Sequence, residues 1–172
     1  MLDRTAELAF AGRVVLWAMR HDVHARDRSR ALPSSVPRLL QLLDRDARLE
    51  HALETFFVTV LDGARRPLAL APPGAPNIGR DERDLLLALV AAYEHFVPES
   101  RALLAEHQHG AFLQASTVAT WRLADALAFR DLPLIPAPTA RSAILTFTNG
   151  SPLRDRAMRG VILRTRGAQH YH

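Results

Sequence analysis

Apolar residues recur at helical spacing through the first 130 positions of the chain. In the segment from about Leu2 to His21 they form a stripe at intervals of three and four residues, whose members are Phe10, Val14, Trp17, His21 and His24. Other apolar residues lie on the opposite side, and a helix with two apolar faces is typically packed between partners, within the domain or across a subunit interface. The charged and Pro-containing residues 21–35 then predict a loop.

The next helical region is predicted to have two parts. The Ser-Ser-x-Pro sequence at residues 34–37 is typical of a helix start, because a Ser hydroxyl caps free backbone N–H groups and Pro fits the first turn. A single helix from there to residue 61 would bring acidic side chains into the apolar stripe, so we expect a break near residues 44–46. The second part is expected to bury Leu49, Leu53, Phe56, Phe57, Val60 and Leu61.

Residues 62–79 interrupt the helical pattern with four of the chain's 11 Pro and three of its eight Gly. Loops of this length are uncommon inside compact domains and often carry function, although a solvated crossover between two helices has the same composition. Both interpretations stay open on the sequence alone.

Three more helices are expected before residue 131. Asp81 is predicted to cap the first, which ends before Pro98 because Pro disfavours helical geometry in the preceding residue. A short helix follows over residues 99–108, and the last long one covers about residues 111–130. The inward-facing side chains of this last helix are expected to be Phe112, Ala119, Leu123 and Leu127.

The pattern changes after Arg130. Residues 132–138 contain three Pro and predict extended chain, while residues 142–148 and 161–165 are rich in β-branched side chains and could form two short strands. The expected fold class is mainly α: a compact bundle of five or six helices over residues 1–130, with an extended C-terminal segment in which a short β-hairpin is one option. We expect this segment, residues 131–172, to dock on the body or on a partner subunit, as part of a single domain.

Charge is distributed unevenly along the chain. All 22 basic residues are Arg, against 18 acidic ones; residues 1–130 carry 16 of each, so the formal excess of +4 lies in the C-terminal segment. Five of its Arg are candidates for binding a polyanion or a partner protein through bidentate contacts, namely Arg154, Arg156, Arg159, Arg164 and Arg166. Nucleic-acid binding is an alternative and not the favoured interpretation, because few aromatic residues interleave with these Arg.

Several classes of protein are excluded or disfavoured by composition. With no Cys, the chain has no disulfide, thiol nucleophile, iron–sulfur cluster or Cys-based zinc site. The longest apolar run, from Leu85 to Tyr93, is far shorter than the roughly 18 residues that cross a membrane. The first residues also lack the apolar core of a secretory signal. We therefore expect a cytoplasmic protein without membrane partners.

Signature motifs of common enzymes are missing too. The phosphate-binding GxxxxGK[ST] loop requires a Lys, and GxGxxG, GxSxG and HExxH do not occur. The acidic group Asp81, Glu82 and Asp84 is explained by a helix start, where negative charge suits the helix dipole. We therefore assign no catalytic residue and expect no cofactor.

His21 and His24 are the only candidates for a metal site. They are three residues apart and would share one side of a helix that continued through both, a spacing that can chelate a metal ion. A third ligand would have to come from elsewhere in the fold.

The favoured function is a non-catalytic interaction or regulatory module that forms a homo-oligomer, because catalytic signatures are missing and the first helix is apolar on two sides. The first alternative is binding of nucleic acid or another polyanion through the C-terminal Arg residues. The second is a small-ligand or metal-binding helical protein that uses His21, His24 and the loop over residues 62–79.

Overall fold

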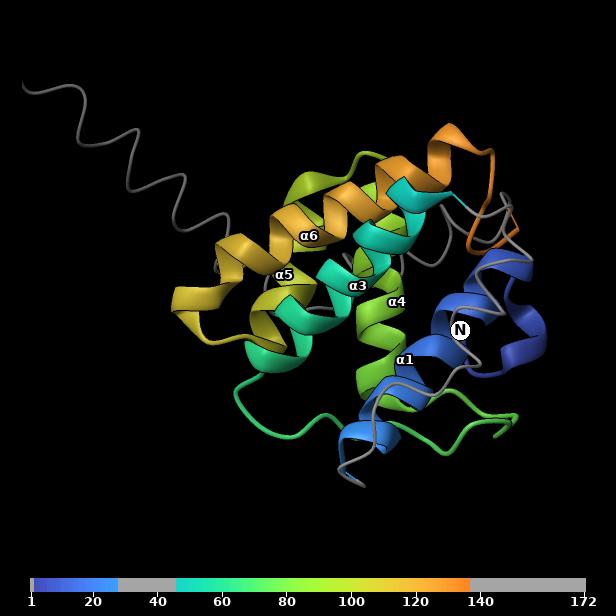
Figure 1. The fold of residues 1–172 in the computed structure, drawn as a ribbon, viewed down its shortest axis with the longest axis horizontal. Helices are drawn as coiled ribbons and strands as arrows, with labels where there is room; N and C mark the ends of the chain where they lie inside the picture. The colour runs from blue at the N-terminus through green and yellow to red at the C-terminus, as the bar shows by residue number, and fades with distance from the viewer. Residues whose placement is uncertain (1, 28–45, 137–172) are drawn as a thin grey trace, which may run out of the picture.

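A computed structural model of the chain describes residues 2–27 and 46–136, which form helices and connecting loops and contain no β-strand. The elements are a 3₁₀ helix, η1 (Thr5–Glu7), and the α-helices α1 (Phe10–Asp27), α3 (Ala47–Asp62), α4 (Arg80–Tyr93), α5 (Val97–His107) and α6 (Gly110–Phe129) (Figure 1). The prediction of a mainly helical fold is therefore confirmed. The helix start expected at residues 34–37 and the two strands expected after residue 141 lie outside the described residues.

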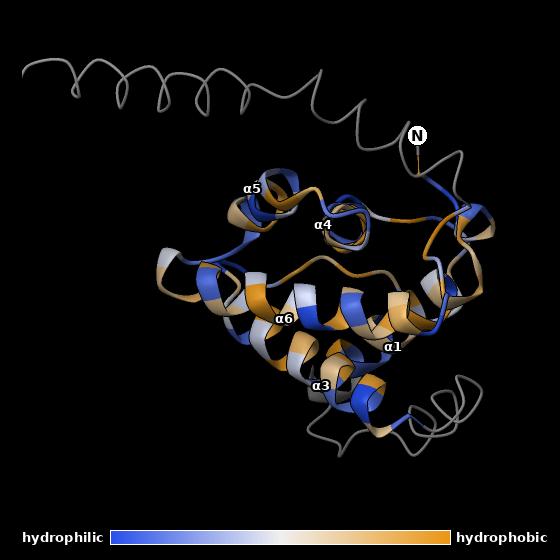
Figure 2. Ribbon diagram, turned by 90° about the horizontal axis from the view of Figure 1, so that it is seen from above, coloured by the Kyte–Doolittle hydropathy of each residue, from blue (hydrophilic) through white to orange (hydrophobic). Residues whose placement is uncertain are grey.

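The helices are arranged in two layers. Helices α1, α3 and α6 lie on one side, and α4 and α5 cover the other (Figures 1 and 2). Helix α6 packs against α3, α4 and α5, and α1 contacts α3 and α4. The core between the layers is built largely from Leu, Ala and Val, and its most completely enclosed apolar side chains include Leu16, Met19, Leu53, Phe56, Leu85, Leu89, Leu104, Leu123 and Leu127.

Helix α3 forms as its sequence predicts. Asp46 caps it by accepting a hydrogen bond from the backbone N–H of Arg48, so this helix begins where its start was predicted, while residues 44 and 45 lie outside the described residues. The predicted stripe is buried from Leu49 to Val60, and Leu61 is partly buried against the same core.

Helix α1 differs from its prediction at both ends. It begins at Phe10, after a separate 3₁₀ turn, and it continues to Asp27, so the loop predicted from residue 21 is wrong for residues 21–27. Of the charged side chains that indicated a loop, Asp22 is buried, as is Arg20 just before the predicted loop. A charged residue at position 22 therefore does not indicate a solvated turn.

The α4–α5 connection lies earlier in the chain than predicted. Helix α4 ends at Tyr93, and His95 has a φ of 63°, in the left-handed region that terminates helices. Helix α5 begins at Val97 with Pro98 in its first turn, where the missing N–H of Pro costs no hydrogen bond. In α6, the expected residues Ala119, Leu123 and Leu127 are buried, but Phe112 is exposed because it lies in the first turn, at the edge of the bundle.

The chain after α6 returns to α1. Leu134 and Ile135 are buried, and the carbonyl of Leu134 accepts a 3.0 Å hydrogen bond from the N–H of Ala9. This backbone passes so close to Gly12 that a β-carbon there would overlap the Leu134 carbonyl, which explains the Gly inside a helix. No helix among the described residues has the length and apolarity needed to cross a membrane.

Candidate functional site

The two histidines of the predicted metal site lie on the second half of α1. His21 stacks on Trp17 with 3.7 Å between ring centroids, and burial, followed by the charge of His24, lowers the pKa of His21 below its ordinary value. Within residues 2–27 and 46–136, no group of three His, Cys, Asp or Glu side chains is placed to hold a metal ion. The third ligand that the metal hypothesis requires is thus not provided by this part of the chain.

The second predicted site lies outside the described residues. Its members, Arg154, Arg156, Arg159, Arg164 and Arg166, all follow residue 136. Polyanion or partner binding by this cluster stays a prediction.

A buried ion pair joins α1 to the start of α4. The Arg20 side chain is 2% exposed and that of Glu82 is 0% exposed, and Arg20 donates two hydrogen bonds to the Glu82 carboxylate, at 2.7 and 2.9 Å. Arg20 also donates to the carbonyls of Ala75 and Asn77, while Glu82 accepts from the backbone N–H groups of Ala71 and Gly79. Every one of these backbone groups belongs to the loop over residues 62–79, so the pair fixes the path of this loop.

Asp81 fixes the same loop from the next position of α4. Its buried carboxylate accepts two hydrogen bonds from Arg66, at 2.8 and 2.7 Å, and one from the N–H of Ala69. The helix cap differs from the prediction, because Gly79 is the N-cap residue and Glu82 accepts its N–H in a capping box. The side chain of Asp81 is therefore used for the loop and not for the cap.

The pKa values of these two carboxyl groups are shifted in the same direction. Burial raises the pKa of Asp81, but the hydrogen bonds from Arg66 and Ala69 outweigh burial and hold it below its ordinary value. For Glu82, burial likewise raises the pKa, and the hydrogen bonds from Arg20, Gly79 and Ala71 outweigh it. A general acid needs a raised pKa. Both groups are instead held ionised with their oxygens already occupied, which favours a structural role.

His107 completes the polar cluster at the start of α4. Its Nε2 lies 3.1 Å from an oxygen of Asp84, and its Nδ1 lies 3.9 Å from an oxygen of Asp81, beyond hydrogen-bond distance. The ring is buried, and none of the described residues pairs with its Nδ1. The next residue, Gln108, donates to the carbonyl of Val60 and accepts from the Ser116 hydroxyl. These contacts tie the end of α5 to α3, α4 and α6.

The loop over residues 62–79 is therefore held at both ends. Arg65 donates its backbone N–H to the carbonyl of His107 at 2.8 Å, and the second half is held by Arg20 and Glu82. A role for the loop as a ligand site stays a prediction, and much of the loop is exposed, as in a solvated crossover, although these contacts hold it in place. They describe a fixed connection whose polar groups bind the ends of neighbouring helices.

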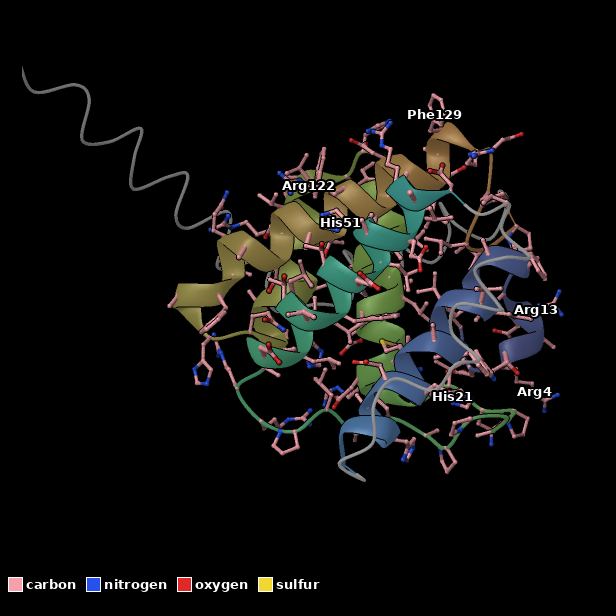
Figure 3. All side chains as sticks on the ribbon, in the orientation of Figure 1. Arg4, Arg13, His21, His51, Arg122 and Phe129 are labelled. Carbon is pink, nitrogen blue, oxygen red and sulfur yellow. The ribbon has the colours of Figure 1, made fainter. Side chains whose placement is uncertain are left out.

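A different surface has the properties of an interaction site. We define the α3–α6 face as two exposed stripes at helical spacing, Arg48, His51, Glu54 and Val58 on α3 and Val118, Arg122, Asp125 and Phe129 on α6. Val58 is 49% exposed, Val118 40% and Phe129 73%, which makes Phe129 the most exposed large apolar side chain among the described residues. Figure 3 shows His51, Arg122 and Phe129 along the α3–α6 pair, away from Arg4 and Arg13.

Helices α3 and α6 are antiparallel, and contacts at both ends fix the register between the two stripes. At one end, Asp46 forms a 3.0 Å ion pair with Arg130, and the guanidinium of Arg48 lies 5.6 Å from the centre of the Phe129 ring. At the other end, Gly63 lies against Phe112. The face also carries balanced charge, since two Arg are matched by Glu54 and Asp125.

Sequence reasoning did not identify this face. Val58 and Val118 fall outside the buried stripes of their helices, and an isolated apolar residue on a helix surface is common. The sequence does show that Val58 and Val118 each belong to a stripe of polar residues at helical spacing. This pattern indicates a shared face only when the antiparallel pairing of α3 and α6 is known.

Comparison of the chain with protein-family models, with curated proteins and with solved structures finds no match.

Proposed function

We propose that this chain is a non-catalytic helical module that associates with a second copy of itself through the α3–α6 face. The observation that carries the proposal is the exposure of Val58, Val118 and Phe129 on two adjacent helices whose opposite sides are buried in the core. Exposed apolar side chains gathered on one surface and bordered by charged groups are typical of protein–protein contact sites.

The size and charge of the face fit a protein partner. On α6 the face runs from Val118 to Phe129, which is about 17 Å of helix, and two adjacent helices are roughly 20 Å wide. Its area of about 340 Å² is in the range of weak complexes, which bury less than ~600 Å² per partner. Its balanced charge does not favour a polyanion or an anionic membrane, which select an excess of Arg or Lys. A surface with both signs and apolar positions suits a second copy, which brings the same mixture.

The mass of the protein in solution tests this proposal. We expect light scattering to show a monomer–dimer equilibrium over micromolar concentrations, and we expect Val118→Glu to weaken dimerisation at least about tenfold, because it places a charge in an apolar contact. The matched control is Val97→Glu, which changes a similarly exposed Val in the first turn of α5, in the other layer.

Two results would contradict the proposal. The first is a wild-type protein that stays monomeric across the concentration range. The second is a dimer that Val118→Glu leaves as stable as Val97→Glu does.

Polyanion binding through the C-terminal Arg residues and ligand binding through His21 and His24 remain the alternative hypotheses. Polyanion binding predicts an affinity that falls steeply with salt, whereas an interface with charge of both signs and an apolar centre predicts a weaker dependence.

A further inference from the structure

The α3–α6 face carries its charges in an order that specifies how two copies would fit together. The register of α3 and α6 is known at both ends, from Asp46 beside Arg130 and from Gly63 beside Phe112. Each step forward along α3 corresponds to a step backward along α6, because both helices rise equally per residue.

Each charged residue of the face on α3 is therefore level with a residue of different charge on α6. Glu54 on α3 is level with Arg122 on α6, and His51 is level with Asp125. Val58 is level with Val118, and both are exposed. The face thus has a carboxylate opposite a guanidinium, an imidazole opposite a carboxylate, and an apolar residue opposite an apolar residue.

These charged groups are available for a partner. Among residues 2–27 and 46–136, none forms a salt bridge with Glu54, Arg122 or Asp125, and all three are exposed. Most other charged groups near the helix ends are already paired, such as Asp46 with Arg130 and Arg83 with Asp3.

We infer that two copies dock through their α3–α6 faces about a two-fold axis parallel to these helices, with α3 of each copy against α6 of the other. This inference rests on the proposed function. Such an axis keeps every residue at its own level, so Glu54 of one copy meets Arg122 of the second copy, and the reverse contact forms at the same time. Val58 of each copy then packs against Val118 of the other.

The alternative two-fold axis, perpendicular to the helices, gives the wrong charge contacts. It places α3 against α3 in opposite directions, and an axis through the middle of the helix brings the residues there against their own equivalents. Glu54 lies at the middle of α3, and Arg122 lies at the same level of α6. Glu54 would then face Glu54 of the second copy, and Arg122 would face Arg122 of the second copy. These contacts between like charges disfavour this arrangement.

Reversal of one charge at a time tests the arrangement, because the two reversals complement each other only between different copies. We expect Glu54→Arg and Arg122→Glu each to weaken self-association at least about tenfold, since each places two like-charge pairs in the dimer. An equimolar mixture of the two variants should regain wild-type association, as a heterodimer that native mass spectrometry identifies by its mass. Glu106→Arg, a reversal of an exposed charge on α5, is the matched control and should dimerise like the wild type.

The outcomes separate this inference from the proposed function. If the wild type dimerises but the mixture does not regain association, or if the single variants dimerise like the control, the arrangement is wrong while self-association stands. If the wild type is monomeric throughout, the proposed function itself fails and the inference fails with it. Circular dichroism of each variant verifies that the helices are retained, which is expected because both side chains are exposed.

Discussion

Replacement of Arg20 by Met is expected to lower the free energy of unfolding by about 3–5 kcal/mol, the usual cost of leaving one partner of a buried ion pair without the other. Glu82 would keep its two backbone donors, from Ala71 and Gly79, but would lose both bonds from the guanidinium. The carbonyls of Ala75 and Asn77 would also lose their donor. Met is close to Arg in length and fills much of the same space, so lost charge pairing and not a cavity dominates the effect. Urea denaturation measures the change.

The control for this substitution is Arg80→Met on α4, the helix that carries Glu82. The Arg80 side chain is 81% exposed, and its ion pair with Asp84 is 3.9 Å long, so its removal should leave the unfolding midpoint within experimental error. A loss of less than about 1 kcal/mol for Arg20→Met would show that the buried pair does not hold the loop and helices together in the way described.

Acidification is expected to destabilise the protein through Asp81 and Glu82. The pKa of each group is lower in the folded chain than its ordinary value, so the stability that it contributes is present at neutral pH and is lost as pH falls through the folded pKa. The contribution of these groups to the free energy of unfolding should therefore hold from about pH 7 to about pH 5 and fall below the ordinary Glu pKa of 4.5.

The variant Glu82→Gln isolates the part of the pH dependence of stability that is due to the buried Arg20–Glu82 pair. It should be much less stable than the wild type at neutral pH, and the gap should narrow as acid protonates Glu82 in the wild type. The exposed variant Glu106→Gln should follow the wild-type curve. A gap between Glu82→Gln and the wild type that stays constant from neutral to strongly acidic pH would contradict the lowered pKa of Glu82.

The sequence was sufficient for the helices whose apolar stripe faces a single core. In α3, apolar residues recur at helical spacing from Leu49 to Val60, and Asp46 precedes them as a cap. Capping and packing therefore both favour a helix that begins after Asp46. Helix α1 was predicted less well because Arg20 and Asp22 are charged but buried. Their burial depends on partners elsewhere in the chain, and Glu82 is 62 residues from Arg20.

The polar cluster at the start of α4 could be predicted only in part. Acidic residues at a helix start are expected from the helix dipole, and this explanation is consistent with the position of Asp81 and Glu82 in the first turn. That Asp81 binds Arg66 and that His107 lies between Asp81 and Asp84 depends on the tertiary fold. For the same reason the α3–α6 face could not be found from periodicity, since its two halves are about 60 residues apart in sequence.

Disulfide trapping shows directly whether two copies meet with α3 of one against α6 of the other. The chain contains no Cys, so a single introduced thiol reports one position without interference. Val58→Cys and Val118→Cys proteins, one carrying a tag that changes its mass, are mixed in equal amounts and exposed to a mild oxidant. A disulfide requires α-carbons roughly 5–6 Å apart, whereas the two α3 helices would lie diagonally across the four helices, about 1.4 times the interhelical spacing of 8–10 Å apart.

We expect the mixed disulfide between residues 58 and 118 to form faster than either disulfide between identical proteins. We also expect it to form faster than in a control mixture that contains Val97→Cys, since Val97 lies on α5 in the other layer. Mixed disulfide at only the control level, or a preference for links between two copies of residue 58, would contradict this arrangement.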